Sequence, residues 1–140
     1  MGIILVNNKA KHKCPLGLKI QQMKAIISLA ISKEGRNVSK IFESVSGIDK
    51  ELLKECGTEY PAELALFAVN ASCRGKGVGK RLFQDMDEQQ LDKFYLFTDT
   101  SCNYGFYEHQ GMVRRSEREH KFNIHGQTAN MNFFIYDYTR

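Results

Sequence analysis

The stretch CRGKGVGKRL, residues 73–82, most constrains what this chain can fold into. It follows a nearly continuous apolar run at residues 63–69, which is typical of a strand buried on both faces. It leads into apolar residues at helical spacing from Val78 onward. The first N–H groups of a helix lack intrahelical acceptors and the helix dipole is positive there, so a strand, a glycine-rich turn and a helix predict an anion site. Because glycines let backbone approach a phosphate closely, we expect a diphosphate at this turn.

The composition is that of one globular domain with a mild positive charge. The 140 residues predict a single domain over 1–140, and 42% of them are hydrophobic, enough for a real core. The net charge of +4 suits an anionic ligand and is too small to indicate a nucleic-acid partner. No apolar run approaches the about 18 residues of a membrane span, and residues 1–8 lack the features of a signal peptide. We therefore expect no membrane partner and a cytoplasmic location.

The first part of the chain, residues 1–60, is interpreted as one strand followed by helical segments. Residues 2–6 form the short apolar run that predicts the strand. Apolar residues at three- and four-residue steps predict three helices, which we expect to use these stripes for packing. The helices and the glycines expected to end them are 16–31 with Gly35, 38–45 with Gly47, and 48–56 with Gly57.

The second part, residues 61–140, has a different pattern, in which strands alternate with helices and two strands close the chain. The predicted strands are 63–69, 94–98, 112–122 and 130–138, and the predicted helices begin at Val78 and span 104–110. This order predicts an α/β (α+β) fold in which helices pack on a mixed sheet.

Two familiar phosphate-binding motifs do not match the glycine turn. A Walker P-loop, G-x-x-x-x-G-K-[ST], would need its first glycine where the chain has Arg74, and Ser or Thr where it has Arg81. The Rossmann fingerprint, G-x-G-x-x-G, would need a third glycine where the chain has Lys80. A third pattern, [RQ]-x-x-G-x-[GA], is met by Arg74, Gly77 and Gly79.

That third pattern is the pyrophosphate signature of the GNAT superfamily of acetyl-CoA-dependent N-acetyltransferases. A second segment, GFYEHQGM at residues 105–112, resembles the [FL]-Y-x-x-x-G-[FM] segment that follows the next strand in that superfamily. The chain resembles the superfamily over roughly residues 61–140. The resemblance implies a mixed, mostly antiparallel central sheet with helices on both faces and an acetyl-CoA-binding core in this part.

The resemblance also implies a binding site for acetyl-CoA as co-substrate. The end of the strand would bond the pantetheine arm through its backbone and direct an N–H at the acetyl carbonyl, where it would stabilise the tetrahedral oxyanion. The glycine turn would hold the pyrophosphate. The residues implied are Phe67, Ala68 and Val69 for the arm, and Arg74, Gly75, Lys76, Gly77, Val78, Gly79 and Lys80 for the pyrophosphate. Asn103 either bonds the pantetheine or caps the helix that follows it. We expect no metal, since no cysteine pair has the C-x-x-C spacing of a zinc site.

Two residues are implied in catalysis. Tyr107 matches the tyrosine that protonates the departing CoA thiolate as general acid, and its alternative role is that of a core aromatic beside Phe106. Glu63 stands where nuclear histone acetyltransferases of the superfamily have their glutamate base, and its alternative is a solvated or salt-bridged carboxylate. Cys73 or Cys102 could carry a covalent route, but direct attack by the amine needs neither.

The amino-terminal part departs from the superfamily pattern. A strand, two helices and a hairpin usually precede the acetyl-CoA strand, whereas here residues 2–6 are the one convincing strand before residue 63. We interpret residues 2–6 as the strand just before the acetyl-CoA strand, followed by a helical insertion in a shortened or truncated member. The insertion or a second subunit would then cover the acceptor side, and an open sheet edge favours a homodimer.

The implied activity is acetyl transfer to a primary amine by direct attack. The acceptor is a small-molecule or peptide amine that the sequence does not specify. The alternative is a non-catalytic CoA-binding or regulatory module of the same fold, which would bind the co-substrate without turnover.

Overall fold

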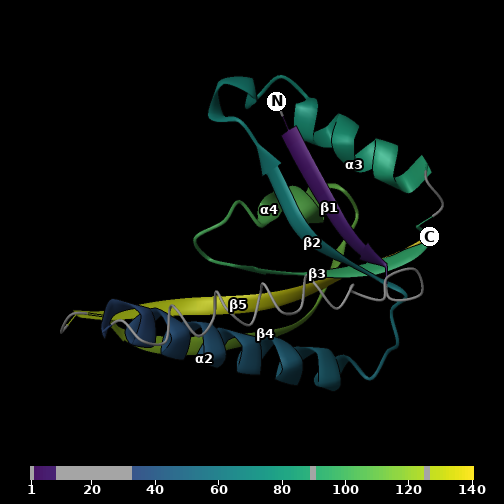
Figure 1. The fold of residues 1–140 in the computed structure, drawn as a ribbon. Coiled ribbons are helices and arrows are strands. Elements are labelled where there is room, and N and C mark those ends of the chain that lie inside the picture. The colour runs from purple at the N-terminus through teal and green to yellow at the C-terminus, as the bar shows by residue number, and fades with distance from the viewer. Residues whose placement is uncertain (1, 9–32, 89–90, 125–126) are drawn as a thin grey trace, which may run out of the picture.

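The computed structural model describes residues 2–8, 33–88, 91–124 and 127–140 (Figure 1). In these residues five strands form one sheet in the order β1-β2-β3-β5-β4. β2 and β3 are parallel, and every other neighbouring pair is antiparallel, which confirms the mixed, mostly antiparallel sheet. β1 pairs with β2, as expected for the strand before the acetyl-CoA strand. The strands are β1 (Gly2–Asn8), β2 (Ala62–Val69), β3 (Lys93–Asp99), β4 (Val113–Ile124) and β5 (Gln127–Thr139).

The helices pack against two faces of this sheet. They are α2 (Lys33–Cys56), the short 3-10 turn η1 (Ala71–Cys73), α3 (Val78–Glu88) and α4 (Gly105–His109). Alternate residues of β3 enter different clusters: Phe94 and Leu96 pack with Phe83 of α3, whereas Tyr95 packs with Leu52 of α2. Because successive side chains of a strand point to opposite faces, α3 and α2 lie on opposite sides of the sheet. Figure 1 shows the same arrangement, with α2 beneath β5 and β4.

The prediction of two short helices separated by Gly47 is wrong, because α2 runs as one helix from Lys33 to Cys56. Gly35 does not end a helix either, since it lies inside α2. The apolar stripe continues across Gly47 to Ile48 and Leu52, which are buried in the cluster against the sheet. That burial outweighs the roughly 1 kcal/mol that glycine costs inside a helix. Gly57 does end α2, with a φ of 58° and its N–H bonded to the Lys54 carbonyl.

The helix end at Gly111 and the four strands predicted for residues 61–140 are found in the structure. Gly111, with a φ of 86°, follows α4 as predicted. The predicted helix over residues 16–31 lies outside the described residues. None of the described helices is both long enough and apolar enough to cross a membrane.

β2 differs from its prediction in one respect that shapes the site. The strand is buried only at its start, at Ala62 and Leu64, and Leu66 is 47% exposed. The reason is that β2 and β3 pair only at Ala62 with Phe94 and at Glu63 with Tyr95, and then diverge. β1 stays paired with β2 along its length, so the second half of β2 has a strand neighbour on one side alone among the described residues.

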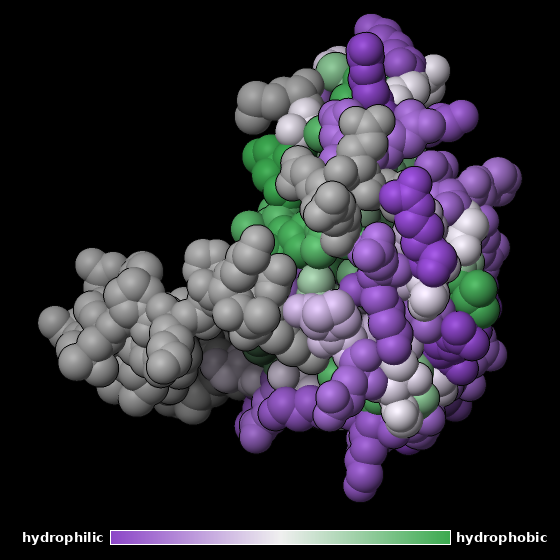
Figure 2. Space-filling model, turned by 90° about the vertical axis from the view of Figure 1, so that its right-hand side faces the viewer, coloured by the Kyte–Doolittle hydropathy of each residue, from purple (hydrophilic) through white to green (hydrophobic). Residues whose placement is uncertain are grey.

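A β-bulge in the β1–β2 pair changes which side chains face the core. The register shifts between Leu5 and Val6, so Val6 opposes Leu64 whereas Leu5 opposes Leu66. A bulge shifts the alternation of a strand by one residue. Phe67 therefore packs against the same cluster as Leu64, although the two are an odd number of residues apart. The side chain of Leu66 is left on the opposite face and is exposed. Figure 2 shows that one side of the molecule carries hydrophobic surface.

Candidate functional site

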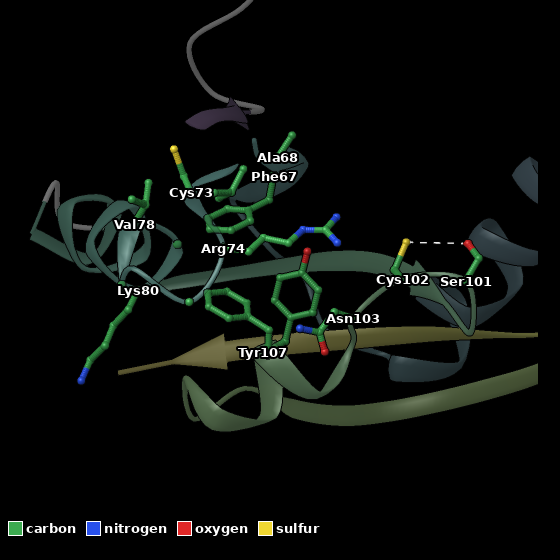
Figure 3. Close-up of a pocket in the computed structure, with 15 residues that line it drawn as sticks. Phe67, Ala68, Cys73, Arg74, Val78, Lys80, Ser101, Cys102, Asn103 and Tyr107 are labelled. Carbon is green, nitrogen blue, oxygen red and sulfur yellow. Dashed lines mark hydrogen bonds between the residues drawn. The ribbon is translucent and has the colours of Figure 1, made fainter. Parts of the chain in front are cut away.

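A cleft of about 820 Å³ lies where β2 departs from β3. Its walls are the end of β2, the glycine turn, the first residues of α3, and the segment from the end of β3 into α4 (Figure 3). Eleven of the thirteen residues expected at the site line it together: Phe67, Ala68, Val69, Arg74, Gly75, Gly77, Val78, Gly79, Lys80, Asn103 and Tyr107. Lys76 and Glu63 are not among its lining residues.

The backbone of the turn is one that glycine alone adopts easily. Gly75 and Gly77 have φ values of 73° and 74°, and an added Cβ would meet nothing within 4 Å at either position. Glycine is therefore needed at these two positions because of the backbone conformation, since residues with a side chain are strained in the left-handed region. The first intrahelical bond of α3 runs from the Arg81 N–H to the Gly77 carbonyl. The preceding N–H groups of the helix have no intrahelical acceptor and can bind an anion at the cleft.

Gly79 lies against two aromatic rings, and a small side chain there would make ordinary van der Waals contacts. A Cβ there would lie 3.4 Å from the Phe106 ring and 3.7 Å from the Phe67 ring. These two rings stack with centroids 5.3 Å apart, and they join β2 to α4 beneath the start of α3. The aromatic pair therefore forms an apolar wall of the cleft next to the polar turn.

The basic side chains of the turn do not all face the cleft. In Figure 3 the Arg74 guanidinium points into the cleft, in the direction of the Tyr107 hydroxyl, whereas the Lys80 ammonium points away. Lys76 is exposed and lies outside the lining. Backbone N–H groups and Arg74 are therefore the groups placed to meet an anion inside the cleft, with the lysines adding charge around it.

Tyr107 lines the cleft and also packs against the core, so its two expected surroundings both occur. Its ring lies edge-on to Phe67 with centroids 6.3 Å apart, and it contacts the buried cluster. Burial, with a smaller effect from nearby Cys102, raises the pKa of the Tyr107 hydroxyl above its usual value. A phenol with a raised pKa is protonated at neutral pH and can donate a proton into the cleft.

The short helix that carries Tyr107 is fixed to the sheet by its neighbour, Glu108. The Glu108 carboxylate accepts hydrogen bonds from Arg114 at 2.7 Å and from the Tyr136 hydroxyl at 2.7 Å. The Arg114 guanidinium also lies over the Phe134 ring, 4.4 Å from its centroid. A five-residue helix has little stability of its own, so these contacts from β4 and β5 decide where Tyr107 points.

Asn103 lies in the cleft lining just before α4. The residue that caps α4 is Tyr104, and no side-chain hydrogen bond caps the helix. Asn103 contributes only its backbone carbonyl, which accepts from the Phe106 N–H at 3.1 Å. Its side chain is therefore not occupied in capping, which leaves the amide able to contact a ligand.

Glu63 lies at the last point where β2 and β3 pair, on the face of the sheet that α2 covers. Its register partner Tyr95 belongs to the cluster on that face, and the Tyr95 hydroxyl donates to the Glu63 carboxylate at 3.4 Å. Burial, together with the charges of Glu63 and Asp99, raises the pKa of Asp49 on α2 to about 6. Glu63 therefore lies where the two strands begin to diverge, and Asp49 and Asp99 add negative charge further along the same side of the sheet.

The raised pKa of Asp49 predicts that the stability of the protein depends on pH, and Asp49→Asn should reveal this dependence. A carboxyl group whose pKa rises from 3.8 to about 6 on folding makes the folded state less stable as pH rises through that interval. Asn carries no charge, so the variant should melt at a higher temperature than the wild type above pH 6, and the difference should shrink toward pH 4. Thermal melts of both proteins from pH 4 to 8 measure it, and parallel curves would contradict the assignment.

The cleft contains four lining residues that were not expected to bind the co-substrate. They are Cys73, Ser101, Cys102 and Phe106. Phe106 could have been found from the sequence, since it precedes the tyrosine in the matched segment. Ser101 and Cys102 line the cleft because the Asp99 carboxylate accepts from the Ser101 N–H at 2.7 Å and turns the chain after β3. The described residues contain no group of three or more side chains suited to a metal ion.

Comparison with known proteins gives structural neighbours and no sequence relatives. No family model matches the chain, and no curated protein matches it. An IAA acetyltransferase from Bacillus cereus is 19% identical with a TM-score of 0.43, over 55% of this chain and 60% of that one. A GNAT family acetyltransferase from Elizabethkingia anophelis with acetyl-CoA bound is 15% identical with a TM-score of 0.41, over 56% and 60%.

A third neighbour matches along the whole chain. It is a putative acetyltransferase from Acinetobacter baylyi, 9% identical with a TM-score of 0.43, over 100% of this chain and 93% of that one. The matched part of this chain spans about 60% of the length of the first two structures.

Proposed function

We propose that this protein is an acetyl-CoA-dependent N-acetyltransferase that transfers an acetyl group to a primary amine. The observation that carries the proposal is the cleft itself, which opens where two parallel strands diverge and has the glycine turn at one end and Tyr107 in its wall. The pattern at Arg74, Gly77 and Gly79 adds the likeness to the superfamily signature.

The divergence of the strands explains how a long, thin ligand arm could bind. Beyond Glu63, the side of β2 that faces β3 has no strand partner among the described residues. Backbone N–H and C=O groups there need other partners, and an amide-containing arm such as pantetheine supplies them. The diphosphate of the same ligand then lies at the turn, where N–H groups at the start of α3 point to the cleft.

The reaction follows from the groups along the cleft. A neutral amine attacks the thioester carbonyl carbon, the C–S bond breaks, and the thiolate takes a proton from Tyr107. A backbone N–H of residues 67–69 stabilises the oxyanion that forms on the way. Glu63, on the other side of the same strand gap, takes the proton that the amine loses, directly or through water.

Calorimetric titration with acetyl-CoA tests the site. The wild type should bind, and Gly77→Glu should weaken binding at least about tenfold, because it places a negative charge and a side chain where the diphosphate lies. Gly57→Glu is the matched control. Gly57 also has a positive φ, 58°, and open space around it, so it suffers the same backbone strain far from the cleft.

Three outcomes separate the alternatives. A folded wild type that does not bind acetyl-CoA would overturn the proposal. Binding that Gly77→Glu and Gly57→Glu weaken equally would show that the loss comes from strain and not from the turn. Binding without release of CoA thiol against any amine would instead support a non-catalytic CoA-binding module.

A further inference from the structure

α2 packs against β4 and β5 on the face of the sheet opposite α3, so that no described helix covers the β1–β2 edge of this face. Ile3, Leu5 and Leu66 are 49%, 56% and 47% exposed. Leu5 pairs with Leu66 and Ile3 pairs with Ala68, and residues paired across an antiparallel ladder share one face. Three large hydrophobic side chains therefore form a continuous patch on the face opposite α3, and Figure 2 shows hydrophobic surface gathered in the hollowed side of the molecule.

This patch is continuous with the cleft. Ala68 pairs with Ile3 of the patch and also lines the cleft. The patch therefore extends to the end of β2, where the cleft begins. Because β3 has departed from β2 at this level, no strand of the described residues lies between the patch and the cleft. A molecule bound on the patch can therefore reach the reacting end of a ligand held in the cleft.

Negative charge lies on the same face. Glu63 opposes Asn7 in the β1–β2 ladder and neighbours Tyr95, whose side chain faces α2. Asp99 is four residues beyond Tyr95 on β3 and so shares its face. Asp49 comes from α2 and is close enough to both for their charges to raise its pKa. Among the described residues, no ion pair joins these three carboxylates to a cation.

We propose that this part of the sheet binds the acceptor and that the acceptor is a small primary amine carrying an apolar arm, with the ammonium group at Glu63 and the arm on Ile3, Leu5 and Leu66. The inference rests on the proposed acetyltransferase function. The chemistry of the two partners is complementary. The Glu63 carboxylate attracts a cation, Asp49 and Asp99 add negative charge further along the same face, and each methylene that leaves water for the patch adds binding free energy. A polyamine fits poorly, because its second charge would lie over the apolar side chains.

The transfer balances in this position. The ammonium loses one proton through Glu63 to solvent. The neutral nitrogen then bonds to the acetyl carbon, the C–S bond of acetyl-CoA breaks, and the nitrogen loses its second proton to Glu63. Tyr107 protonates the sulfur, so that the products are the N-acetyl amine and CoA thiol. The proton held by Glu63 returns to Tyr107 through solvent before the next cycle.

The test compares four amines: phenethylamine and hexylamine, which carry an apolar arm, against ethanolamine and spermidine, which do not. Thiol release gives kcat/KM for each, and calorimetric titration of phenethylamine onto the CoA-bound protein gives its binding without chemistry. The wild type should prefer the first two by at least about tenfold. Leu66→Gln should remove most of that preference and leave kcat/KM for ethanolamine and the Kd for acetyl-CoA unchanged.

Val113→Gln is the matched control, since Val113 is an exposed hydrophobic residue, 50% accessible, on β4 at the opposite edge of the sheet from β1. It should change none of these values. The inference is overturned if spermidine or ethanolamine is the better acceptor, or if Leu66→Gln affects all four amines alike. It is also overturned if light scattering shows a wild-type dimer that Leu66→Gln converts to a monomer, because the patch would then be an interface between copies.

The failure of the proposed function has a different signature. If phenethylamine binds in a Leu66-dependent way but no amine causes release of CoA thiol, the proposed acceptor site is supported and the transferase activity is contradicted. If acetyl-CoA itself does not bind, the cleft assignment fails, and the inference falls with it.

Discussion

Replacing Tyr107 by phenylalanine should lower kcat about 100- to 1000-fold and leave the Kd for acetyl-CoA close to that of the wild type. The ring that packs against Phe67 and the core is retained, so the fold of α4 and the cleft wall should persist. What disappears is the hydroxyl, whose raised pKa keeps it protonated at neutral pH. The leaving thiolate then has to take its proton from water. Steady-state kinetics with a saturating amine, together with calorimetric titration, measure the two quantities.

Tyr104→Phe is the matched control for this experiment. It makes the same change three residues earlier, at a residue outside the cleft lining whose ring packs against Phe134, 5.0 Å between centroids. Its kcat should stay within about twofold of the wild type. The pH dependence of the wild type gives a further check. An ordinary tyrosine ionises near pH 10. Because the pKa of Tyr107 is raised above that value, the loss of activity caused by its ionisation should begin at a higher pH. Equal kcat values for the wild type and Tyr107→Phe would show that Tyr107 is only a core aromatic.

Phe94→Ala should destabilise the protein by about 3–5 kcal/mol, the range for truncating a buried aromatic side chain. Phe94 is fully buried at the junction where β2 and β3 pair. Its ring packs between Tyr138, 5.2 Å away, and Phe83 of α3, 6.0 Å away. The substitution leaves a cavity under the point from which the two strands diverge, and equilibrium denaturation in urea gives the change in free energy of unfolding.

Phe42→Ala provides the control, since it is the same substitution on a side chain of α2 that is 75% exposed. Its free energy of unfolding should change by less than about 0.5 kcal/mol. A similar loss in both variants would show that α2 does not present Phe42 to solvent as described. If Phe94→Ala lost less than about 1 kcal/mol, the junction would be able to repack, and the cleft would not depend on it.

The local features of this protein could be predicted from its sequence. Residues 73–82 predict the turn and the start of α3, because φ values above zero and a free helix start depend on the residues at those positions. The stop of α2 at Gly57 and the end of α4 at Gly111 were predictable for the same reason. Most of the cleft lining was predictable as well, since it belongs to two short segments whose residue types carry the pattern.

Other features depend on contacts between distant segments. Gly47 does not interrupt α2, because Ile48 and Leu52 are buried against strands that come much later in the chain. The position of Glu63 outside the cleft lining follows from how β2 pairs with β3, and the raised pKa of Asp49 follows from its burial on α2 with the charges of Glu63 and Asp99 nearby. The sequence of each segment taken alone does not predict how these segments pack together.

The sequence by itself determined the glycine turn and the tyrosine segment, since each depends on the conformations that neighbouring residues can adopt. Only the tertiary structure decided what lies around them. The bulge at Leu5 and Val6 sends Phe67 to the cleft side and Leu66 to the opposite face, and the divergence of β2 from β3 opens the passage between the two. The bulge and the divergence are both properties of strand pairing. A shift of one residue in the pairing moves each later side chain of the strand to the other face of the sheet.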